Sequence, residues 1–228
     1  MAAIITVISR PIFGQTNDNK ERKFHFFGSY NIGFGHIISK VQAGLLKPES
    51  DEVNKLRNGS INQLEFGLRY KSFGIAYVYN HYQTSASTGY SGYDLNYDGL
   101  SEDGQLNDKF HLKFMGCTFL YKFYFLKKKF DITYKYSLGW QKYLLAKQVL
   151  FYGFNGGTYK VNIEGSKFSQ LIGLESNFHF YKFLSLGIEA SYLPGKFNKL
   201  TYNGEEKTLE NPETVNRLNY GVKLSIEL

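Results

Sequence analysis

The stretch RLNYGVKLSIEL, residues Arg217 to Leu228, alternates polar and apolar residues over its whole length. Successive side chains of a β-strand point to opposite faces, so this stretch would have one apolar and one polar face if it were extended. The apolar face would carry Leu218, Tyr220, Val222, Leu224, Ile226 and Leu228, and the polar face Arg217, Asn219, Gly221, Lys223, Ser225 and Glu227.

The same alternation returns earlier in the chain. It is clear in residues 63–70, 132–140, 172–180 and 184–192, and less strict in 24–34 and 73–82. Residues 109–125 are apolar on both faces, so the pattern does not say which of those faces points inward. These segments predict eight strands of about the length that a membrane-crossing strand needs.

The links between these segments alternate between short and long. Short links lie at 71–72, 126–129 and 181–182, whereas the links 38–58, 84–108, 146–165 and 195–215 run to roughly twenty residues or more. Alternating link lengths with an even number of strands are typical of outer-membrane barrels. The sequence thus predicts an all-β fold: an eight-stranded antiparallel up-and-down transmembrane β-barrel with short periplasmic turns and long extracellular loops.

The polar face of the strands distinguishes a membrane barrel from a soluble, lipocalin-like barrel with a greasy interior. A wall exposed to water should be dense in Lys and Glu, but these polar positions are mostly Gly, Ser, Thr and Asn. Small residues suit a crowded lumen, because an eight-stranded barrel is just wide enough for side chains to fill it. Each predicted strand adds one glycine to this face: Gly33, Gly67, Gly74, Gly116, Gly139, Gly173, Gly187 and Gly221.

Charged residues on the polar face carry both signs, so they are able to neutralise one another inside the lumen. We prefer structural ion pairs to a proton or ion path, because so narrow a barrel leaves no continuous water column. The acidic members are Glu65, Glu175, Glu189 and Glu227, and the basic members are Arg69, Lys135, Lys223 and Arg217.

The composition excludes several other classes of protein. Aromatic residues make up 18% of the chain, which a disordered chain would lack. The single cysteine, Cys117, allows no intramolecular disulfide and is expected to be an apolar wall residue. The net charge of +7 is scattered apart from Lys127 to Lys129, so we predict no nucleic-acid partner. No apolar stretch reaches the ~20 residues of a membrane helix.

The first fifteen residues differ from the rest of the chain. Ala2 to Ile8 is an apolar run that Arg10 and Pro11 follow, which is typical of the end of a secretory signal peptide. We expect residues 1–15 to be a signal remnant and residues 16–228 a single outer-membrane barrel domain. The alternative is an ordinary N-terminal strand or plug. No cysteine follows the apolar run, so we expect no lipoprotein anchor.

The pattern over Phe24 to Leu228 resembles small outer-membrane β-barrel proteins of Gram-negative bacteria, particularly the Bacteroidetes type rich in Tyr, Phe, Lys and Asn. The segment Tyr220 to Leu228 looks like a barrel-closing strand, although it ends in Leu228 where many such barrels have an aromatic residue. The resemblance implies a bacterial outer-membrane location, with lipid and lipopolysaccharide as surroundings. It implies no single activity, because one fold serves many functions.

One loop carries the spacing of a calcium site. Asp94, Asn96, Asp98, the carbonyl of Leu100 and Glu102 follow the D-x-N-x-D-G pattern, in which alternate residues direct oxygens toward one cation. The twelfth position is Gln105 where a bidentate Glu is expected, so any Ca²⁺ affinity should be weak. An ordinary acidic surface loop is the preferred interpretation, and no other cofactor is expected.

The histidines offer the remaining candidate chemistry. His36, His81 and His111 fall near the external strand ends and could meet there as metal ligands, though their spacing is not diagnostic. A lipid A acyl-chain modifying enzyme would need a base and a nucleophile at a strand end, and the available pairs are His81 with Ser85 or Ser87, and His111 with Asp108.

The leading hypothesis from the sequence is a monomeric, non-enzymatic outer-membrane barrel. It would act in membrane integrity, or bind a surface ligand or partner protein through its extracellular loops. Exposed aromatics would take part, namely Tyr90, Tyr93, Tyr97, Phe151, Tyr152, Phe154 and Tyr202. The alternatives are a lipid-modifying enzyme of the same fold and a small-molecule carrier or narrow channel that uses the lumen.

Overall fold

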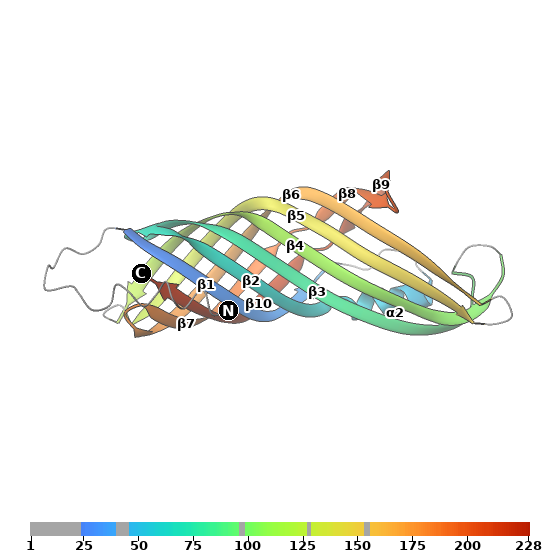
Figure 1. Cartoon of the computed structure of the whole chain (residues 1–228), viewed down its shortest axis with the longest axis horizontal. Coiled ribbons are helices and arrows are strands. Elements are labelled where there is room, and N and C mark those ends of the chain that lie inside the picture. Colours follow the sequence, from blue (N-terminus) through green and yellow to red (C-terminus); the bar gives the residue numbers. More distant parts are fainter. Residues whose placement is uncertain (1–23, 40–45, 96–98, 127–128, 153–155) are drawn as a thin grey trace, which may run out of the picture.

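The computed structural model describes residues 24–39, 46–95, 99–126, 129–152 and 156–228. Eight antiparallel strands form a closed ring in the order β1-β2-β3-β4-β5-β6-β7-β10 (Figure 1). The predicted eight-stranded up-and-down barrel is therefore confirmed. No helix of the described residues is long and apolar enough to cross a membrane. The ring consists of β1 (Phe24–Ile37), β2 (Asn58–Tyr70), β3 (Phe73–Tyr93), β4 (Glu102–Phe125), β5 (Phe130–Tyr152), β6 (Gly157–Tyr181), β7 (Leu184–Leu193) and β10 (Arg217–Glu227).

The ring closes where the first strand pairs with the last. β1 and β10 run antiparallel over eleven residue pairs, with Gly33 opposite Gly221 near the middle. At the end of this seam, Phe26 and Leu228 exchange two backbone hydrogen bonds, at 3.1 and 2.8 Å. Because the ring is closed, no strand has a free edge in the part of the barrel where β1 and β10 pair, as a membrane barrel requires.

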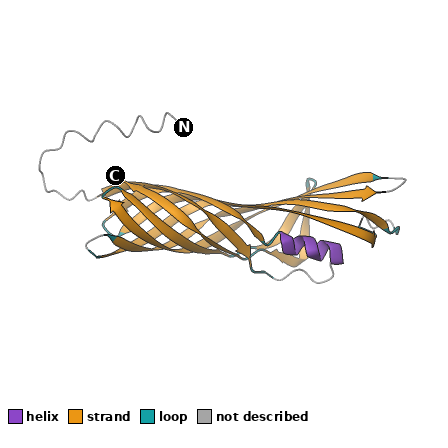
Figure 2. Cartoon of the chain, turned by 90° about the horizontal axis from the view of Figure 1, so that it is seen from below, coloured by secondary structure: helices purple, strands orange, loops and turns teal. Residues whose placement is uncertain are grey.

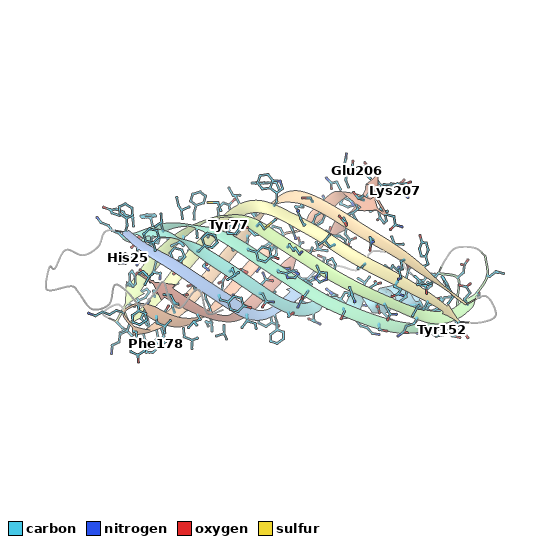
Figure 3. The ribbon with its side chains drawn as sticks, in the orientation of Figure 1. His25, Tyr77, Tyr152, Phe178, Glu206 and Lys207 are labelled. Carbon is cyan, nitrogen blue, oxygen red and sulfur yellow. The ribbon has the colours of Figure 1, made fainter. Side chains whose placement is uncertain are left out.

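The alternation in the sequence separates the two faces of the wall. Apolar side chains of the alternating segments point outward and remain exposed, as for Ile188 on β7, of which 67% is accessible. Tyr77 and Phe178 project from the outer wall in Figure 3. In β4, whose orientation the sequence left open, Phe110, Leu112 and Phe114 point inward and Cys117 lies on the exposed outer face.

Close contact between strands explains one pair of inward-facing glycines. Gly116 on β4 and Gly139 on β5 are directly opposite each other. A Cβ atom on Gly139 would overlap the carbonyl oxygen of Met115, and one on Gly116 would overlap that of Leu138. A larger residue at either position would force the two strands apart.

Two of the predicted long loops are mostly strand. β3 and β4 continue as a paired ladder to Tyr93 and from Glu102, and β5 and β6 remain paired as far as Phe151 and Gly157. The prediction of loops at 84–108 and 146–165 was wrong for most of these residues. The exposed apolar side chains form a belt around the barrel, and beyond this belt the outer face of the strands is polar. The alternation of polar and apolar residues therefore weakens there, although the hydrogen-bonded pairing of the strands continues.

The other two long links also contain regular structure. Helix α2 (Lys47–Lys55) lies beside the projecting strands (Figure 2) and contacts β3, where Lys55 Nζ donates to the carbonyl oxygen of Ser87 at 2.6 Å. Strands β8 (Lys196–Tyr202) and β9 (Glu205–Thr214) form a hairpin that joins β6 through the pair Ile163 and Tyr202. Both edges of the projecting sheet β3–β6 are thus covered in part, which limits its pairing with other chains.

The interior is arranged in layers along the barrel. Polar and charged residues fill the part near the short turns. Val78, Phe114, Leu171 and Leu193 form a small apolar cluster of their own. A larger apolar cluster and then a cavity occupy the end toward α2 and the hairpin. The larger cluster contains Ile37, Leu56, Ile61, Tyr82, Phe110, Leu112, Tyr143, Phe197, Leu200 and Val215.

Candidate functional site

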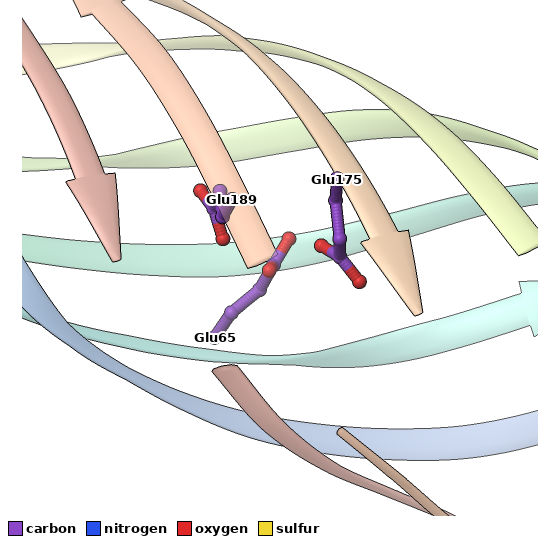
Figure 4. A group of neighbouring side chains, drawn as sticks. All are labelled: Glu65, Glu175 and Glu189. Carbon is purple, nitrogen blue, oxygen red and sulfur yellow. The ribbon is translucent and has the colours of Figure 1, made fainter. Parts of the chain in front are cut away.

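Three glutamates, which Figure 4 shows side by side in the lumen, form the first charged layer together with two lysines. Lys135 Nζ lies 2.7, 2.6 and 3.0 Å from carboxylate oxygens of Glu65, Glu175 and Glu189. Lys223 Nζ lies 2.9 Å from the same oxygen of Glu65 and 2.5 Å from Glu175. Because all five side chains are almost fully buried, each charge depends on the others for compensation.

A second charged layer lies nearer the short turns. Arg69 pairs with Glu227, and Lys122 Nζ lies 3.5 Å from Glu227 and 3.3 Å from Asp131. His179 Nε2 is 2.5 Å from the same carboxylate of Asp131. The structure therefore brings seven of the eight charged lumen residues expected from sequence into two ion-pair layers: Glu65, Arg69, Lys135, Glu175, Glu189, Lys223 and Glu227.

Arg217 takes a different position from the other basic lumen residues. Its guanidinium carbon lies 4.9 Å from the centre of the Tyr82 ring, and the side chain donates to Asn80. The sequence pattern grouped it with the lumen carboxylates because it shares their face of the wall. Its place at the start of β10 puts it far along the barrel from Glu227, at the other end of the same strand.

The lumen offers little room for a ligand or a water path. The carboxylates of Glu65, Glu175 and Glu189 approach one another closely enough to hold a metal ion, but Lys135 and Lys223 already lie against them. The remaining space at this level is about 20 Å³, about the room for a single water. Above it, the apolar clusters fill the interior.

A cavity of about 690 Å³ lies beyond the larger apolar cluster, among α2, the projecting sheet and the β8–β9 hairpin. Cavities that bind small molecules usually fall in this size range and combine apolar walls with a few polar groups. Its apolar lining comes from both sides of the projecting part: Ile37, Val53, Leu56, Leu106, Phe110, Tyr143, Leu145, Ile163, Leu200, Tyr202, Leu209, Pro212 and Val215.

Two buried carboxylates are among the polar groups of this cavity. Glu52 on α2 is 1% exposed and Asp108 on β4 is 4% exposed. Glu52 accepts a hydrogen bond from the Thr88 hydroxyl and interacts with the backbone of Asp108. Glu52 Oε1 and Asp108 Oδ1 have no hydrogen-bond partner among the described residues. Burial raises the pKa of Glu52, and it raises the pKa of Asp108 to about 7.

The cationic side chains near these carboxylates have other partners. Lys147 Nζ lies 2.8 Å from Glu49 Oε1, and Lys55 Nζ donates to Thr88 Oγ1 at 2.6 Å. Arg57 donates to the carbonyl oxygens of Ile37 and Ser39 at 2.9 and 3.0 Å. Lys147 still lowers the pKa of Asp108 through its charge, but burial has the larger effect.

The predicted calcium loop is described in part. Asn96 and Asp98 lie outside the described residues. Asp94 Oδ2 accepts a hydrogen bond from the Gly99 amide at 2.9 Å, and the φ angle of Gly99 is +91°, the left-handed conformation expected for that glycine. Leu100 is exposed, and Glu102 begins β4. At the twelfth position, the Gln105 side chain donates to Ser87 Oγ.

Two of the three candidate histidines lie together, on the outer face of the wall. His81 Nε2 and His111 Nδ1 are 3.1 Å apart, and the rings are stacked. His36 instead contacts Asn58 Oδ1 at 2.7 Å.

The candidate pairs of the rival enzyme function are not assembled. His111 faces outward and Asp108 faces the cavity, because residues an odd number apart on a strand occupy opposite faces. Ser85 is on the same face as His81 but four positions away, roughly 13 Å along the strand.

The cavity was missed by sequence reasoning, although one signal for it was present. Asn203 and Gly204 form an Asn-Gly dipeptide, a strong sequence signal for a tight hairpin, within the segment 195–215 that was expected to be a loop.

The aromatic residues of the expected loops do not all lie on the surface. Tyr90 is buried against Leu95 and Leu106, and Tyr202 lines the cavity. Tyr152, in contrast, is exposed at the far end of the sheet (Figure 3). Tyr97 and Phe154 lie outside the described residues.

Comparison with known proteins places the fold. No protein-family model matches the chain, and no curated protein matches its sequence. A major outer membrane protein from Thermus thermophilus has a TM-score of 0.54 at 12% identity, over 91% of this chain and 100% of that one. This likeness and the exposed apolar belt identify the fold as that of a bacterial outer-membrane β-barrel.

Two further solved structures are less similar. Ail, the attachment invasion locus protein of Yersinia pestis, in complex with the heparin analogue sucrose octasulfate, has a TM-score of 0.48 at 10% identity, over 91% of this chain and 100% of that one. The outer membrane protease OmpT from Escherichia coli has a TM-score of 0.45 at 8% identity, over 92% and 99% of the two chains. The resemblance to the Bacteroidetes type stays a prediction.

Proposed function

We propose that the protein is a monomeric, non-enzymatic barrel of the bacterial outer membrane that binds a small ligand in its external cavity. The observation that carries this proposal is the cavity of about 690 Å³ among α2, β4–β6 and the β8–β9 hairpin. Its apolar walls and few buried polar groups are the usual features of a binding site. Surface binding thus takes place in a partly open pocket of the projecting part instead of on exposed loop tips.

The length of the strands supports a position of the cavity outside the membrane. β5 has 23 residues, which at ~3.3 Å per residue and a tilt of ~40° extend about 58 Å along the barrel axis. The apolar band of such barrels is about 25 Å tall, so roughly half of β5 projects beyond it. Lys147 lies in this projecting half of β5, directly opposite Asp108 of β4, so both residues are beyond the membrane and accessible to a ligand from the medium.

The arrangement of the interior supports binding over the rival functions. Buried ion pairs and apolar clusters fill the lumen of the described residues, which disfavours a channel. The histidine pairs expected for an enzyme face away from the cavity carboxylates. Weak Ca²⁺ binding at Asp94 to Glu102 remains a separate proposal, which a shift in melting temperature on adding Ca²⁺ to the EDTA-treated protein would test.

A cavity-filling variant tests the binding function. Ile163 lines the cavity, so Ile163→Trp should occupy part of the space, whereas Ile172→Trp adds the same side chain on the exposed outer face of β6. Binding of three probes with one apolar body, 4-phenylbutylamine, 4-phenylbutan-1-ol and 4-phenylbutyrate, is measured by calorimetry on protein in lipid nanodiscs, with empty nanodiscs as the blank. At least one probe should bind the wild type and Ile172→Trp equally, and Ile163→Trp at least tenfold more weakly. Probe binding that is the same in all three proteins, or absent from the wild type, would contradict the proposal.

A further inference from the structure

The charges that line the external cavity are mainly negative. Five carboxylates face three cationic side chains, and two of the five, Glu52 and Asp108, are almost fully buried. The full set is Glu49, Glu52, Asp108, Glu210 and Glu213 against Arg57, Lys147 and Lys207. Burying a charged group is costly unless it is paired, so the two carboxylates that are almost fully buried, Glu52 and Asp108, are the ones that call for an explanation.

Glu52 and Asp108 come from different elements and meet at one side of the cavity. Glu52 belongs to α2 and Asp108 to β4, and the two carboxylates are close enough that Glu52 raises the pKa of Asp108 through its charge. Each keeps one carboxylate oxygen, Oε1 of Glu52 and Oδ1 of Asp108, without a hydrogen-bond partner among the described residues. Buried polar atoms in folded proteins are nearly always paired, so these two oxygens point to a missing donor.

The nearby side chains do not supply that donor. Lys147 pairs with Glu49, and Lys55 donates to Ser87 and Thr88. Arg57 donates to the backbone carbonyls of Ile37 and Ser39. A donor from outside the chain would complete the hydrogen bonding of both carboxylates.

We propose that the cavity binds an amphipathic organic cation, in which a protonated amine contacts Glu52 and Asp108 while an apolar body lies against Phe110 and Tyr143. This inference rests on the proposed binding function and names the class of ligand. The ammonium group supplies up to three N–H donors, enough for the two unpartnered oxygens. The apolar walls favour an organic cation over a metal ion, which needs oxygen ligands on several sides.

The raised pKa values of the Glu52 and Asp108 carboxyl groups are those expected when no cation is paired with them. Burial raises the pKa of Asp108 to about 7 and also raises the pKa of Glu52, so without a ligand both groups are less ionised than exposed carboxyls. A bound ammonium reverses this effect, because a nearby opposite charge favours the ionised form of a carboxyl.

The three probes of equal body and different charge test the class of ligand. We expect 4-phenylbutylamine to bind at least tenfold more tightly than 4-phenylbutan-1-ol, and 4-phenylbutyrate to bind most weakly. Asp108→Asn and Glu52→Gln should each reduce amine binding about tenfold and leave binding of the alcohol within about twofold. Glu206→Gln, which changes an exposed hairpin residue paired with Lys199, should leave all three affinities unchanged (Figure 3).

The pH dependence gives a second readout that a loss of folding would not imitate. Asp108 faces Lys147 of β5 and Glu49 and Glu52 of α2, and its carboxyl ionises as the pH rises through its pKa of about 7. The amine of the probe stays protonated over this range, since an alkyl amine resembles lysine. Amine affinity of the wild type should therefore rise roughly tenfold between pH 5.5 and 8.5, and that of Asp108→Asn should rise much less.

The outcomes separate the two proposals. If the three probes bind with equal affinity and Ile163→Trp weakens all three, the ligand is not specifically a cation, but the cavity remains a binding site. Amine binding that ignores Asp108→Asn and Glu52→Gln, in variants that keep the wild-type difference in gel migration between boiled and unboiled samples, would overturn it equally. If no probe binds, or Ile163→Trp has no effect, the binding function itself fails.

Discussion

Lys135 is the residue on which the lumen charges depend. Its amine contacts all three buried glutamates of the first layer, whereas the closest contacts of Lys223 are with Glu65 and Glu175, at 2.9 and 2.5 Å. Removing one member of a buried charge network leaves the others without compensation, which costs more than the pair contributed. The layer is therefore sensitive to the loss of this one side chain.

We expect Lys135→Met to lower the free energy of unfolding by about 3–5 kcal/mol, the usual cost of an uncompensated buried charge. Urea unfolding of the protein in lipid vesicles measures this change. Lys142→Met is the matched control, because Lys142 lies on the exposed outer face of the same strand. Adding Glu175→Gln to Lys135→Met should recover part of the loss, and an unfolding midpoint equal to that of the wild type would show that the network does not stabilise the barrel.

At the scale of elements, the β8–β9 hairpin forms one wall of the cavity. Its two turn residues, Asn203 and Gly204, have φ values of +49° and +95°, the conformation that a two-residue type I′ turn requires. Gly204 adopts this conformation without a steric penalty, whereas a β-branched residue does not. The hairpin pairs with β6 at Ile163 and Glu164, and its turn residue Asn203 exchanges two hydrogen bonds with Asn162, so the turn is important for the position of the hairpin.

Gly204→Val should disrupt this hairpin and open the cavity. We expect the affinity for whichever phenylbutyl probe binds the wild type to fall at least tenfold, while the barrel below keeps its heat-dependent gel migration. Gly89→Ala is the control, because a Cβ there meets only an ordinary contact with Gly104. If both variants bind the probe as the wild type does, the hairpin is not a wall of the binding site.

The sequence predicted the elements inside the membrane better than those beyond it. A lipid-facing wall must be apolar, so strands such as β7 and β10 carry a strict alternation that is visible in the residues alone. Outside the membrane, both faces of a strand are free to be polar, and 84–93 and 146–152 look like loop sequence although they continue the ladder. The lumen residues followed from the face they share, but the cavity did not, because α2, β4 and the hairpin meet only through tertiary packing.

The whole molecule is divided between two surroundings along its length. The outer face of β6 carries Leu174, Ile172 and Phe168 in the barrel and then Glu164 and Asn162 in the projecting part. The same strand thus changes the character of its outer face where it leaves the lipid. The position of this change defines the membrane border without reference to any bound lipid.

A charged residue should therefore have opposite consequences in the two halves. Ile188→Lys, near the middle of the outer face of β7, should reduce the free energy of unfolding in lipid vesicles by about 2–4 kcal/mol, because the charge enters the apolar part of the bilayer. Asn162→Lys, on the outer face of the projecting part of β6, should change it by less than about 0.5 kcal/mol. Similar effects of the two substitutions would place the membrane border elsewhere.

The seam between β1 and β10 also has a consequence for the order of events during assembly. The two strands that complete the ring are the first and the last of the described chain, so their pairing closes a loop of nearly its full length. Contacts between distant residues form slowly, since the loop-closure entropy is lost before the contact is gained. Until Arg217 to Leu228 arrives, β1 and β7 each present an open edge to lipid. The rate of maturation should therefore be set by the pairing of β10 with β1 and β7, which completes the ring.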